Sequence, residues 1–379
     1  MVIYMKTIFE RITEDETDVL LEFLENEKVA TNMKDEVGRT PLHLAVANNK
    51  VAVAALLLQQ GFSPNTKDET MLSPFIAAAA NGFDEMFELL LQYQPELNQV
   101  NRFGGSALLP SSEKGFLRVV QRALDVGVPV NHVNRLGWSA LLEAVILGDE
   151  GFLFQEIVEE LLANGADKMI SDFDQKNAVD YAKSLDKKII QQLLEKSQQK
   201  NRFTEIKKEI RQKRYYLALQ QLLAMEESLE QIYYLAYTYE SLKQNDAAIY
   251  YYRKGLRKDA QFAYYLANLT KKIGERQQVL AYFDQGIENG NRTFFLYHKS
   301  NYLREIGEHQ QAIAIMDELL SSDPQRVDYL FHKANSLRSL GKHQEAYDAM
   351  ILANQFQPTN NLFLEHAAQS QKFLENNGG

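Results

Sequence analysis

Histidine is the side chain in this 379-residue sequence best suited to proton transfer or metal binding, because its ordinary pKa lies close to neutral pH. The seven histidines are at positions 43, 132, 298, 309, 332, 343 and 366. The interval from His298 to His332 is the same as that from His309 to His343. Equivalent positions in packed helical repeats lie about 10 Å apart, whereas a histidine ligand lies about 2 Å from its metal ion. We therefore expect structural histidines repeated with their surroundings, and no metal site.

Sequence motifs for phosphate binding, dinucleotide binding, zinc hydrolysis and serine hydrolysis are all missing from the chain. There is no cysteine, which excludes disulfides, thiolate zinc sites and iron–sulfur clusters. The 51 acidic residues include none that is paired with a recognisable apolar pocket able to perturb its pKa. The sequence thus predicts a protein that is not an enzyme, has no cofactor and takes no small-molecule substrate.

One recurring pattern could support binding: an aromatic residue, an asparagine four positions later and a basic residue three further on. Positions i, i+4 and i+7 share one face of a helix. The three copies are Tyr264, Asn268 and Lys271, then Tyr297, Asn301 and Arg304, then Phe331, Asn335 and Arg338. An amide both donates and accepts hydrogen bonds, so a ladder of asparagines can bind the main chain of an extended peptide, and the basic residues would attract carboxylates. Alternatively, the triplets are passive repeat duplications on a solvated face.

Charge and tyrosine content divide the chain near residue 196. Residues 1–195 carry 17 basic and 30 acidic side chains with 3 tyrosines, whereas residues 196–379 carry 24 and 21 with 16 tyrosines. The net charge of −10 argues against non-specific binding to nucleic acid, which requires basic side chains. No apolar run approaches the roughly 20 residues of a membrane span, and the N-terminus is too acidic for a targeting peptide. These features predict two domains in a cytoplasmic protein.

A period of about 33 residues runs through the first half. The segments GRTPLHLA (38–45), MLSPFIAA (71–78), GGSALLPS (105–112) and GWSALLEA (137–144) place a small hydroxyl residue in register at Thr40, Ser73, Ser106 and Ser139. This pattern resembles the ankyrin repeat, with four copies, a degenerate fifth at 174–182 and an N-terminal helical cap at 7–34. The interval from Gly127 to Gly165 exceeds one period by five positions, which indicates an insertion in the fourth repeat, around 148–154. Pro110 falls inside the first helix of the third repeat and should distort that turn.

The ankyrin resemblance implies a structural role for His43 and a partner-binding role for the hairpin tips. The tip residues are Arg39, Arg102, Phe103, Arg135, Leu136 and Trp138. Tryptophan, phenylalanine and arginine are types that often dominate protein interfaces, so these tips are candidate contacts for a second protein. In the alternative interpretation, Trp138 packs between neighbouring hairpins and only fills space.

The second half has its own repeat, of nearly the same length. GEHQQAIAIMDELLSSDP (307–324) aligns with GKHQEAYDAMILANQFQP (341–358) at an offset of 34. The pattern resembles a tetratricopeptide-repeat array of paired helices, with units near 199–228, 229–259, 260–292, 293–326 and 327–360 and a terminal helix at 361–375. That resemblance implies that the aromatic–Asn–basic triplets line a concave peptide-binding groove. Tyr233 and Tyr237 occupy the equivalent face of an earlier unit and suit apolar anchors of a ligand.

Between the arrays, residues 196–214 contain eight basic and two acidic residues and nothing that breaks a helix, so they predict a continuous connecting helix. Its basic side chains form either a solvated helix face, which we favour, or a patch that binds nucleic acid or an acidic partner. Together these patterns predict an all-α double solenoid: ankyrin repeats with short β-hairpin loops over 1–195, then tetratricopeptide repeats over 196–379. The predicted function is a non-catalytic adaptor or scaffold that binds other proteins or peptides. The alternative is a secreted or translocated effector that binds host proteins.

Overall fold

The computed structural model describes residues 7–14, 17–195 and 202–377, and the chain divides into two compact units. The first unit comprises Met1–Gly148 and Glu156–Ile190, and the second comprises Asp149–Gln155 and Gln191–Gly379. The sequence suggests a single boundary near residue 196, whereas the structure divides the chain slightly earlier and assigns Asp149–Gln155 to the second unit. Over the described ranges the chain is all-helical, and the expected β-hairpin loops are turns in which only Val133 and Ser139 form an isolated bridge.

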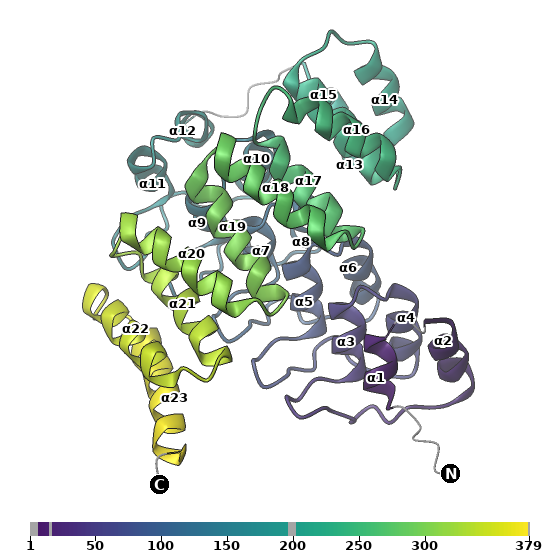
Figure 1. Ribbon diagram of the computed structural model, residues 1–379. Helices are drawn as coiled ribbons and strands as arrows, with labels where there is room; N and C mark the ends of the chain where they lie inside the picture. The colour runs from purple at the N-terminus through teal and green to yellow at the C-terminus, as the bar shows by residue number, and fades with distance from the viewer. Residues whose placement is uncertain (1–6, 15–16, 196–201, 378–379) are drawn as a thin grey trace. The chain divides into compact units, whose positions relative to one another are not determined.

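Short helices joined by tight turns build the chain up to residue 195 (Figure 1). The helices are α1 (Ile8–Thr13), α2 (Thr17–Asn26), α3 (Pro41–Ala47), α4 (Val51–Gln59), α5 (Pro74–Asn81), α6 (Asp84–Leu91), α7 (Leu108–Glu113), α8 (Leu117–Asp125), α9 (Ala140–Leu147), α10 (Phe152–Ala163), α11 (Ala178–Ser184) and α12 (Lys188–Glu195). Two of the divisions between the units fall inside helices, after Gln155 in α10 and after Ile190 in α12.

The residues that recur once per repeat begin the first helix of most repeats. The hydroxyl oxygens of Ser73 and Ser139 accept a hydrogen bond from the main-chain N–H three positions later, at 3.3 Å in both cases. Asn177 does the same in the fifth repeat, accepting from two N–H groups at 2.9 and 3.1 Å. At Thr40, the main-chain N–H donates instead to Nδ1 of His43 at 3.0 Å. Each bond satisfies a donor that the start of a helix leaves unpaired, which explains the constant spacing of these residues.

The third repeat departs from this pattern at Pro110, as the sequence predicts. Helix α7 begins at Leu108, two positions after Ser106, whereas α5 and α9 begin directly after their serines. Ala107, which precedes the helix, already has helical dihedral angles (φ −57°, ψ −31°), and no side-chain bond caps it. Pro110 occupies the first turn of α7, where a missing N–H removes no intrahelical bond. The proline is therefore tolerated, but this repeat starts its helix late and without a cap.

Gly82 shows how one repeat packs against the next. It ends α5 with a left-handed φ of 69°, and a Cβ atom built there would lie 2.4 Å from the ring of Phe116. Phe116 directly precedes the second helix of the following repeat and is buried. Only glycine satisfies both the backbone conformation and the close approach of the ring.

The second unit continues with helices that form successive pairs (Figure 1), and one pair falls in each of the five units that the sequence predicts. These helices are α13 (Thr204–Arg211), α14 (Tyr215–Leu223), α15 (Leu229–Ser241), α16 (Asn245–Leu256), α17 (Phe262–Lys272), α18 (Arg276–Asn289), α19 (Arg292–Glu305), α20 (His309–Ser322), α21 (Val327–Ser339), α22 (His343–Phe356) and α23 (Asn361–Asn377). The predicted connecting helix at 196–214 lies partly outside the described residues. Where it is described, α13 ends at Arg211 and Lys213 has a left-handed φ of 60°, so the helix does not extend to residue 214.

Glycines inside two helices of the second unit make room for aromatic rings of the next pair. A Cβ atom on Gly255 in α16 would lie 2.2 Å from the ring of Phe262, and one on Gly286 in α18 would lie 2.1 Å from the ring of Phe295. Glycine costs about 1 kcal/mol in a helix interior relative to alanine. That cost is offset here by complete burial of Phe262 and Phe295, which are 0% and 1% exposed.

The insertion in the fourth repeat of the first half lengthens the second helix of that repeat. Helix α10 has 12 residues, whereas α4, α6 and α8 have 8 or 9. Its first turn and the three positions before it form the segment Asp149–Gln155, which packs as part of the second unit. The insertion that the sequence located near 148–154 thus has a packing role of its own.

Candidate functional site

The aromatic residues that the sequence assigned to an open groove are buried. Tyr233, Tyr264, Tyr297 and Phe331 lie on α15, α17, α19 and α21, and each is only 1–3% exposed; Tyr237 is 8% exposed. The expectation that these rings line a solvent-filled groove is therefore wrong. The physical reason is that each ring fills space within the stack of helix pairs, where burying an aromatic side chain is strongly stabilising.

The buried rings contact histidines of the following helix pair. The Tyr264 hydroxyl lies 3.1 Å from Nδ1 of His298, and the Tyr297 hydroxyl lies 3.2 Å from Nε2 of His332. The ring of Phe331 continues the series with an edge contact to His366, with centroids 4.9 Å apart. The spacing of His298, His332 and His366 thus corresponds to a repeated aromatic–histidine contact along the second unit.

The asparagines of the triplets orient arginines on their own helices. Arg304 donates to the amide oxygen of Asn301, and Arg338 donates to that of Asn335. Asn301 and Asn335 are 4% and 8% exposed, while the arginines are half-buried. The amide oxygens are consequently engaged within the helix and are not open acceptors for a ligand, contrary to the expected amide ladder. The Asn–Arg pairs instead hold two guanidinium groups in fixed positions.

The first triplet differs from the other two. Asn268 is half-buried, and Lys271 pairs with Glu305 of α19 and lies 5.9 Å from the centroid of the Tyr302 ring. The cation at this position is therefore neutralised by the next helix pair. The Asn–Arg arrangement is a feature of the second and third triplets.

The segment Asp149–Gln155 is seated on the aromatic end of this face. The ring centroids of Phe152 and Tyr233 are 5.5 Å apart, and those of Phe154 and Tyr264 are 6.1 Å apart. Phe154 is fully buried and also meets Phe294 edge-on at 5.7 Å. Two phenylalanines that follow a glycine thus fill the place where the sequence predicted apolar anchors of a ligand.

Polar contacts fix the same segment. The main-chain N–H of Phe152 donates to Oε1 of Gln261 at 3.2 Å, and the Tyr265 hydroxyl donates to the same oxygen at 2.7 Å. A Cβ atom on Gly151 would lie 2.4 Å from that oxygen and 2.7 Å from the Tyr265 hydroxyl. Burial raises the pKa of Tyr265 well above its usual value, and the negative charge of Asp149 adds to the effect. The face recognises this segment by shape and by a main-chain hydrogen bond.

The histidines His298 and His332 lie against tyrosine hydroxyls of the second unit. Among the residues that the structure describes, no group of three or more histidine and acidic side chains could hold a metal ion. His43 has the structural position that the ankyrin resemblance implies: Nε2 lies 3.2 Å from the carbonyl oxygen of Leu72, and burial lowers its pKa. Across the same described ranges, no helix is both long and apolar enough to span a membrane.

Trp138 is not an exposed tip residue. It is 6% exposed, and its indole Nε1 donates to Oδ2 of Asp172 at 3.1 Å. The Tyr181 hydroxyl donates to the same carboxylate oxygen at 2.5 Å. The next hairpin thus supplies a hydrogen-bond acceptor that lets the whole indole be buried, so the space-filling alternative is correct and the interface assignment of Trp138 is wrong.

The other tip residues retain partial exposure but have contacts within the array. Arg39 is exposed and pairs with Asp35 at 2.8 Å, and Arg102 lies over the ring of Phe103 at 4.6 Å from the centroid. Arg135 and Leu136 are half-buried. These tips form a polar surface with one aromatic ring, which is the part of the predicted ankyrin interface that the structure leaves accessible.

A repeated element that the sequence interpretation missed orders all five hairpin tips. An aspartate or asparagine at positions 35, 68, 101, 134 and 172 accepts hydrogen bonds from the main-chain N–H groups two and four positions later, at 2.8–3.2 Å. Their regular interval, lengthened only across the insertion in the fourth repeat, was visible in the sequence. A short polar side chain that recurs before each turn is the signal of such an Asx turn.

Known proteins resemble the chain over its first half. A family model described as an ankyrin repeat matches residues 37–69, and one described as ankyrin repeats in three copies matches residues 74–172. A solved ankyrin-repeat domain from Acinetobacter baumannii is 34% identical over 49% of this chain and 95% of that one, with a TM-score of 0.47. A second solved ankyrin-repeat protein is 34% identical over 50% of this chain and 97% of its own, with a TM-score of 0.48. None of the curated proteins matches the chain.

The matched residues are those whose caps and turns recur once per repeat. The first family model begins at residue 37, near the first tip, and the second ends at Asp172, the last of the Asx-turn residues. Residues 37–69 and 74–172 of the first half are therefore ankyrin repeats.

Proposed function

We propose that the chain is a non-catalytic adaptor, which binds a peptide along the face of α15, α17, α19 and α21 and a second protein through the ankyrin hairpin tips. Ankyrin-repeat proteins generally mediate protein–protein interaction. We also propose that the second unit is a tetratricopeptide-repeat array, because its helix pairs follow the units expected from that resemblance. The segment Asp149–Gln155 is the observation that carries the peptide proposal, since this face already holds two phenylalanine rings and a main-chain N–H group.

The arginines of the second and third triplets are the proposed ligand contacts on the rest of the face. Asn301 and Asn335 fix the guanidinium groups of Arg304 and Arg338, which lowers the conformational entropy that a ligand must remove. A fixed guanidinium group is well suited to a carboxylate. The preferred ligand is therefore a peptide with an acidic residue at the end of the face formed by α19 and α21. The arginines contribute more to the affinity for this peptide than the asparagines do.

The full chain can be used as bait to select peptides from a random display library, followed by affinity measurements with fluorescence anisotropy. Changing Arg304 or Arg338 to Ala should weaken binding of the selected acidic peptides about 10-fold each, since bonds to charged groups contribute roughly 1.5–3 kcal/mol. Arg292→Ala is the matched control, because Arg292 is an exposed arginine of α19 that pairs with Glu318. Unchanged affinity in both arginine variants would contradict the proposal and place peptide binding elsewhere.

A further inference from the structure

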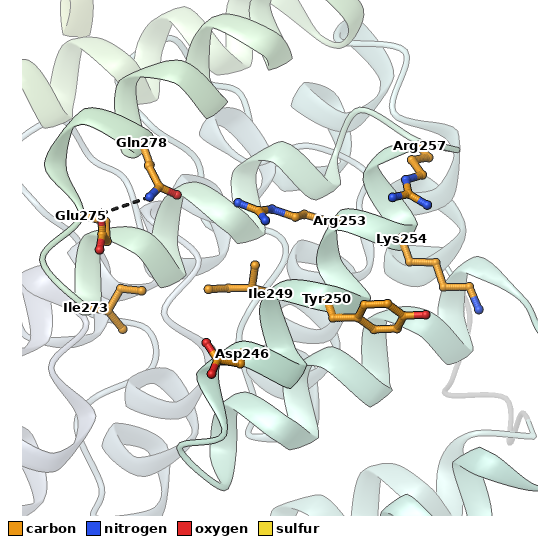
Figure 2. Close-up of a pocket in the computed structure, with 9 residues that line it drawn as sticks. All are labelled: Asp246, Ile249, Tyr250, Arg253, Lys254, Arg257, Ile273, Glu275 and Gln278. Atoms are coloured by element: carbon orange, nitrogen blue, oxygen red, sulfur yellow. Dashed lines mark hydrogen bonds between the residues drawn. The ribbon is translucent and has the colours of Figure 1, made fainter.

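A pocket between α16 and the start of α18 has no role in the proposed peptide face. Its volume is about 540 Å³, and its lining includes Asp246, Ile249, Tyr250, Arg253, Arg257 and Ile273. Figure 2 shows Ile249 and Ile273 on either side of the pocket, with Arg253 above them and Asp246 below. Tyr250 and Ile273 are 62% and 39% exposed, so the pocket offers apolar surface to a ligand.

The basic residues of the pocket are not equally available to a ligand. Lys254, which also lines the pocket, and the neighbouring Lys258 both donate to Glu227 and lower the pKa of that carboxyl group to about 2. Arg253 donates from Nε to the Tyr282 hydroxyl at 3.2 Å, and this bond does not use its two terminal nitrogens. Arg257 is exposed and forms no hydrogen bond or ion pair with any residue in the described ranges. Two guanidinium groups therefore remain to bind an anion.

The available groups form a ladder along α16. Ile249, Arg253 and Arg257 are spaced four positions apart, and side chains with this spacing on a helix are about 6 Å from one another. Alternate residues of an extended peptide point the same way and are separated by nearly the same distance, about 6.6 Å. Asp246 lies one turn before Ile249, so the ladder changes from acidic through apolar to basic along the helix.

From this match we propose that the pocket binds an extended acidic peptide in which an apolar residue is followed by carboxylates two and four positions later. The apolar side chain lies between Ile249 and Ile273, and the carboxylates bind Arg253 and Arg257. A basic residue two positions before the apolar one faces Asp246. The surface is separate from the face of the Asn–Arg pairs, so the chain can bind two peptides through its second unit.

The probe for this proposal is a fluorescent peptide of sequence Lys-Ser-Leu-Ser-Glu-Ser-Glu, titrated with the full chain and followed by anisotropy. Arg253→Ala and Arg257→Ala should each weaken binding about 10-fold, and the loss should shrink as salt is added. Ile273→Ser should also weaken binding, and it should leave the fold intact because Ile273 is part-exposed. Arg292→Ala again serves as the control for an exposed arginine outside the pocket.

Three results would overturn the proposal. The first is unchanged affinity in the two pocket arginine variants. The second is equal affinity for a peptide in which serine replaces the leucine, since that would show charge attraction without use of the apolar pocket. The third is a concentration-dependent dimer, measured by light scattering, that Arg253→Ala abolishes, since that would make a second copy of this chain the occupant. Arg304→Ala should leave this probe's affinity unchanged, which separates the pocket from the proposed peptide face.

Discussion

The two halves of the chain repeat with nearly the same period, but their polar residues bond to different groups. In the hairpin tips, Asn101 and Asn134 accept hydrogen bonds from main-chain N–H groups. In the second unit, Asn301 and Asn335 accept from arginine side chains of their own helices. The main-chain N–H groups of each tip turn are present in every repeat, so each turn requires a short side chain with an acceptor oxygen at the same position. A hydrogen bond between two side chains, such as Asn–Arg, can instead be replaced by a different pair of residues. This difference explains why the tips keep one residue class while the triplets change from lysine to arginine.

The largest expected effect concerns the packing between hairpins. Trp138→Ala should lower the free energy of unfolding by roughly 3–5 kcal/mol, because it removes a buried indole and leaves a cavity. Trp138→Phe is the control that keeps most of the ring and loses the bond to Asp172, and it should cost less. Urea unfolding followed by circular dichroism measures both. Because Trp138 is the only tryptophan, native emission should also be blue-shifted, and red-shifted emission would contradict its burial.

A smaller effect compares the two kinds of asparagine directly. Asn101→Ala removes the acceptor for the N–H groups of Phe103 and Gly105, so it should cost about 1–3 kcal/mol for two lost hydrogen bonds. Asn335→Ala should cost under about 1 kcal/mol, because alanine favours the helix and the bond it removes is between side chains. The measurement is the urea midpoint of each variant. If Asn335→Ala proves the more destabilising change, the distinction between the two halves is wrong.

The smallest effect depends on pH and arises at Glu143 in α9. Burial raises the pKa of this carboxyl group well above its usual value, and the nearby negative charge of Glu113 adds to the shift; Asn134 and Lys114 oppose it. The folded state therefore binds the proton more tightly than the unfolded state, and the stability that this group contributes falls as pH rises from about 4.5 through the folded pKa. Glu143→Gln should remove this dependence and be more stable than the wild type at pH 8. Parallel stability curves from pH 5 to pH 8 would contradict it.

Sequence patterns predicted the parts of the fold that depend on local geometry. The register of Ser73 and Ser139 was visible in the sequence, and the structure gives its cause: a helix start requires a hydrogen-bond acceptor at one position, which Asn177 supplies in the fifth repeat. The insertion was located by the irregular glycine spacing, but its packing partner Tyr233 is distant in the chain and no local signal reveals the contact. Burial of Trp138 depends on its hydrogen bond to Asp172 of the next hairpin. The motif of a single repeat does not show this contact, so the burial could not be predicted from it.

The prediction that the aromatic–Asn–basic triplets line an open groove was wrong for a related reason. Helical periodicity places positions i, i+4 and i+7 on one face, yet it does not tell whether that face meets solvent or the next helix pair. Tyr264 and Tyr297 are buried against histidines, which are polar residues that the sequence interpretation treated separately. The aromatic residues and the histidines each recur at a constant spacing in the sequence. The sequence interpretation did not infer that each aromatic residue contacts a histidine of the next helix pair.

Hydrogen exchange at the segment Asp149–Gln155 tests the central claim that the second unit recognises a peptide segment. The first N–H groups of α10 have no intrahelical acceptor, so protection at Phe152 reports the bond to Gln261. The amides of Phe152 and its neighbours should be protected in the wild-type full chain, and Gly151→Ala should speed their exchange at least 10-fold because its Cβ would collide with Gln261 and Tyr265. Gly105→Ala is the control, since the nearest atoms to a Cβ there lie at an ordinary contact distance of 3.5 Å. Exchange of Phe152 at the rate of an unstructured peptide, or protection unchanged in Gly151→Ala, would contradict the account.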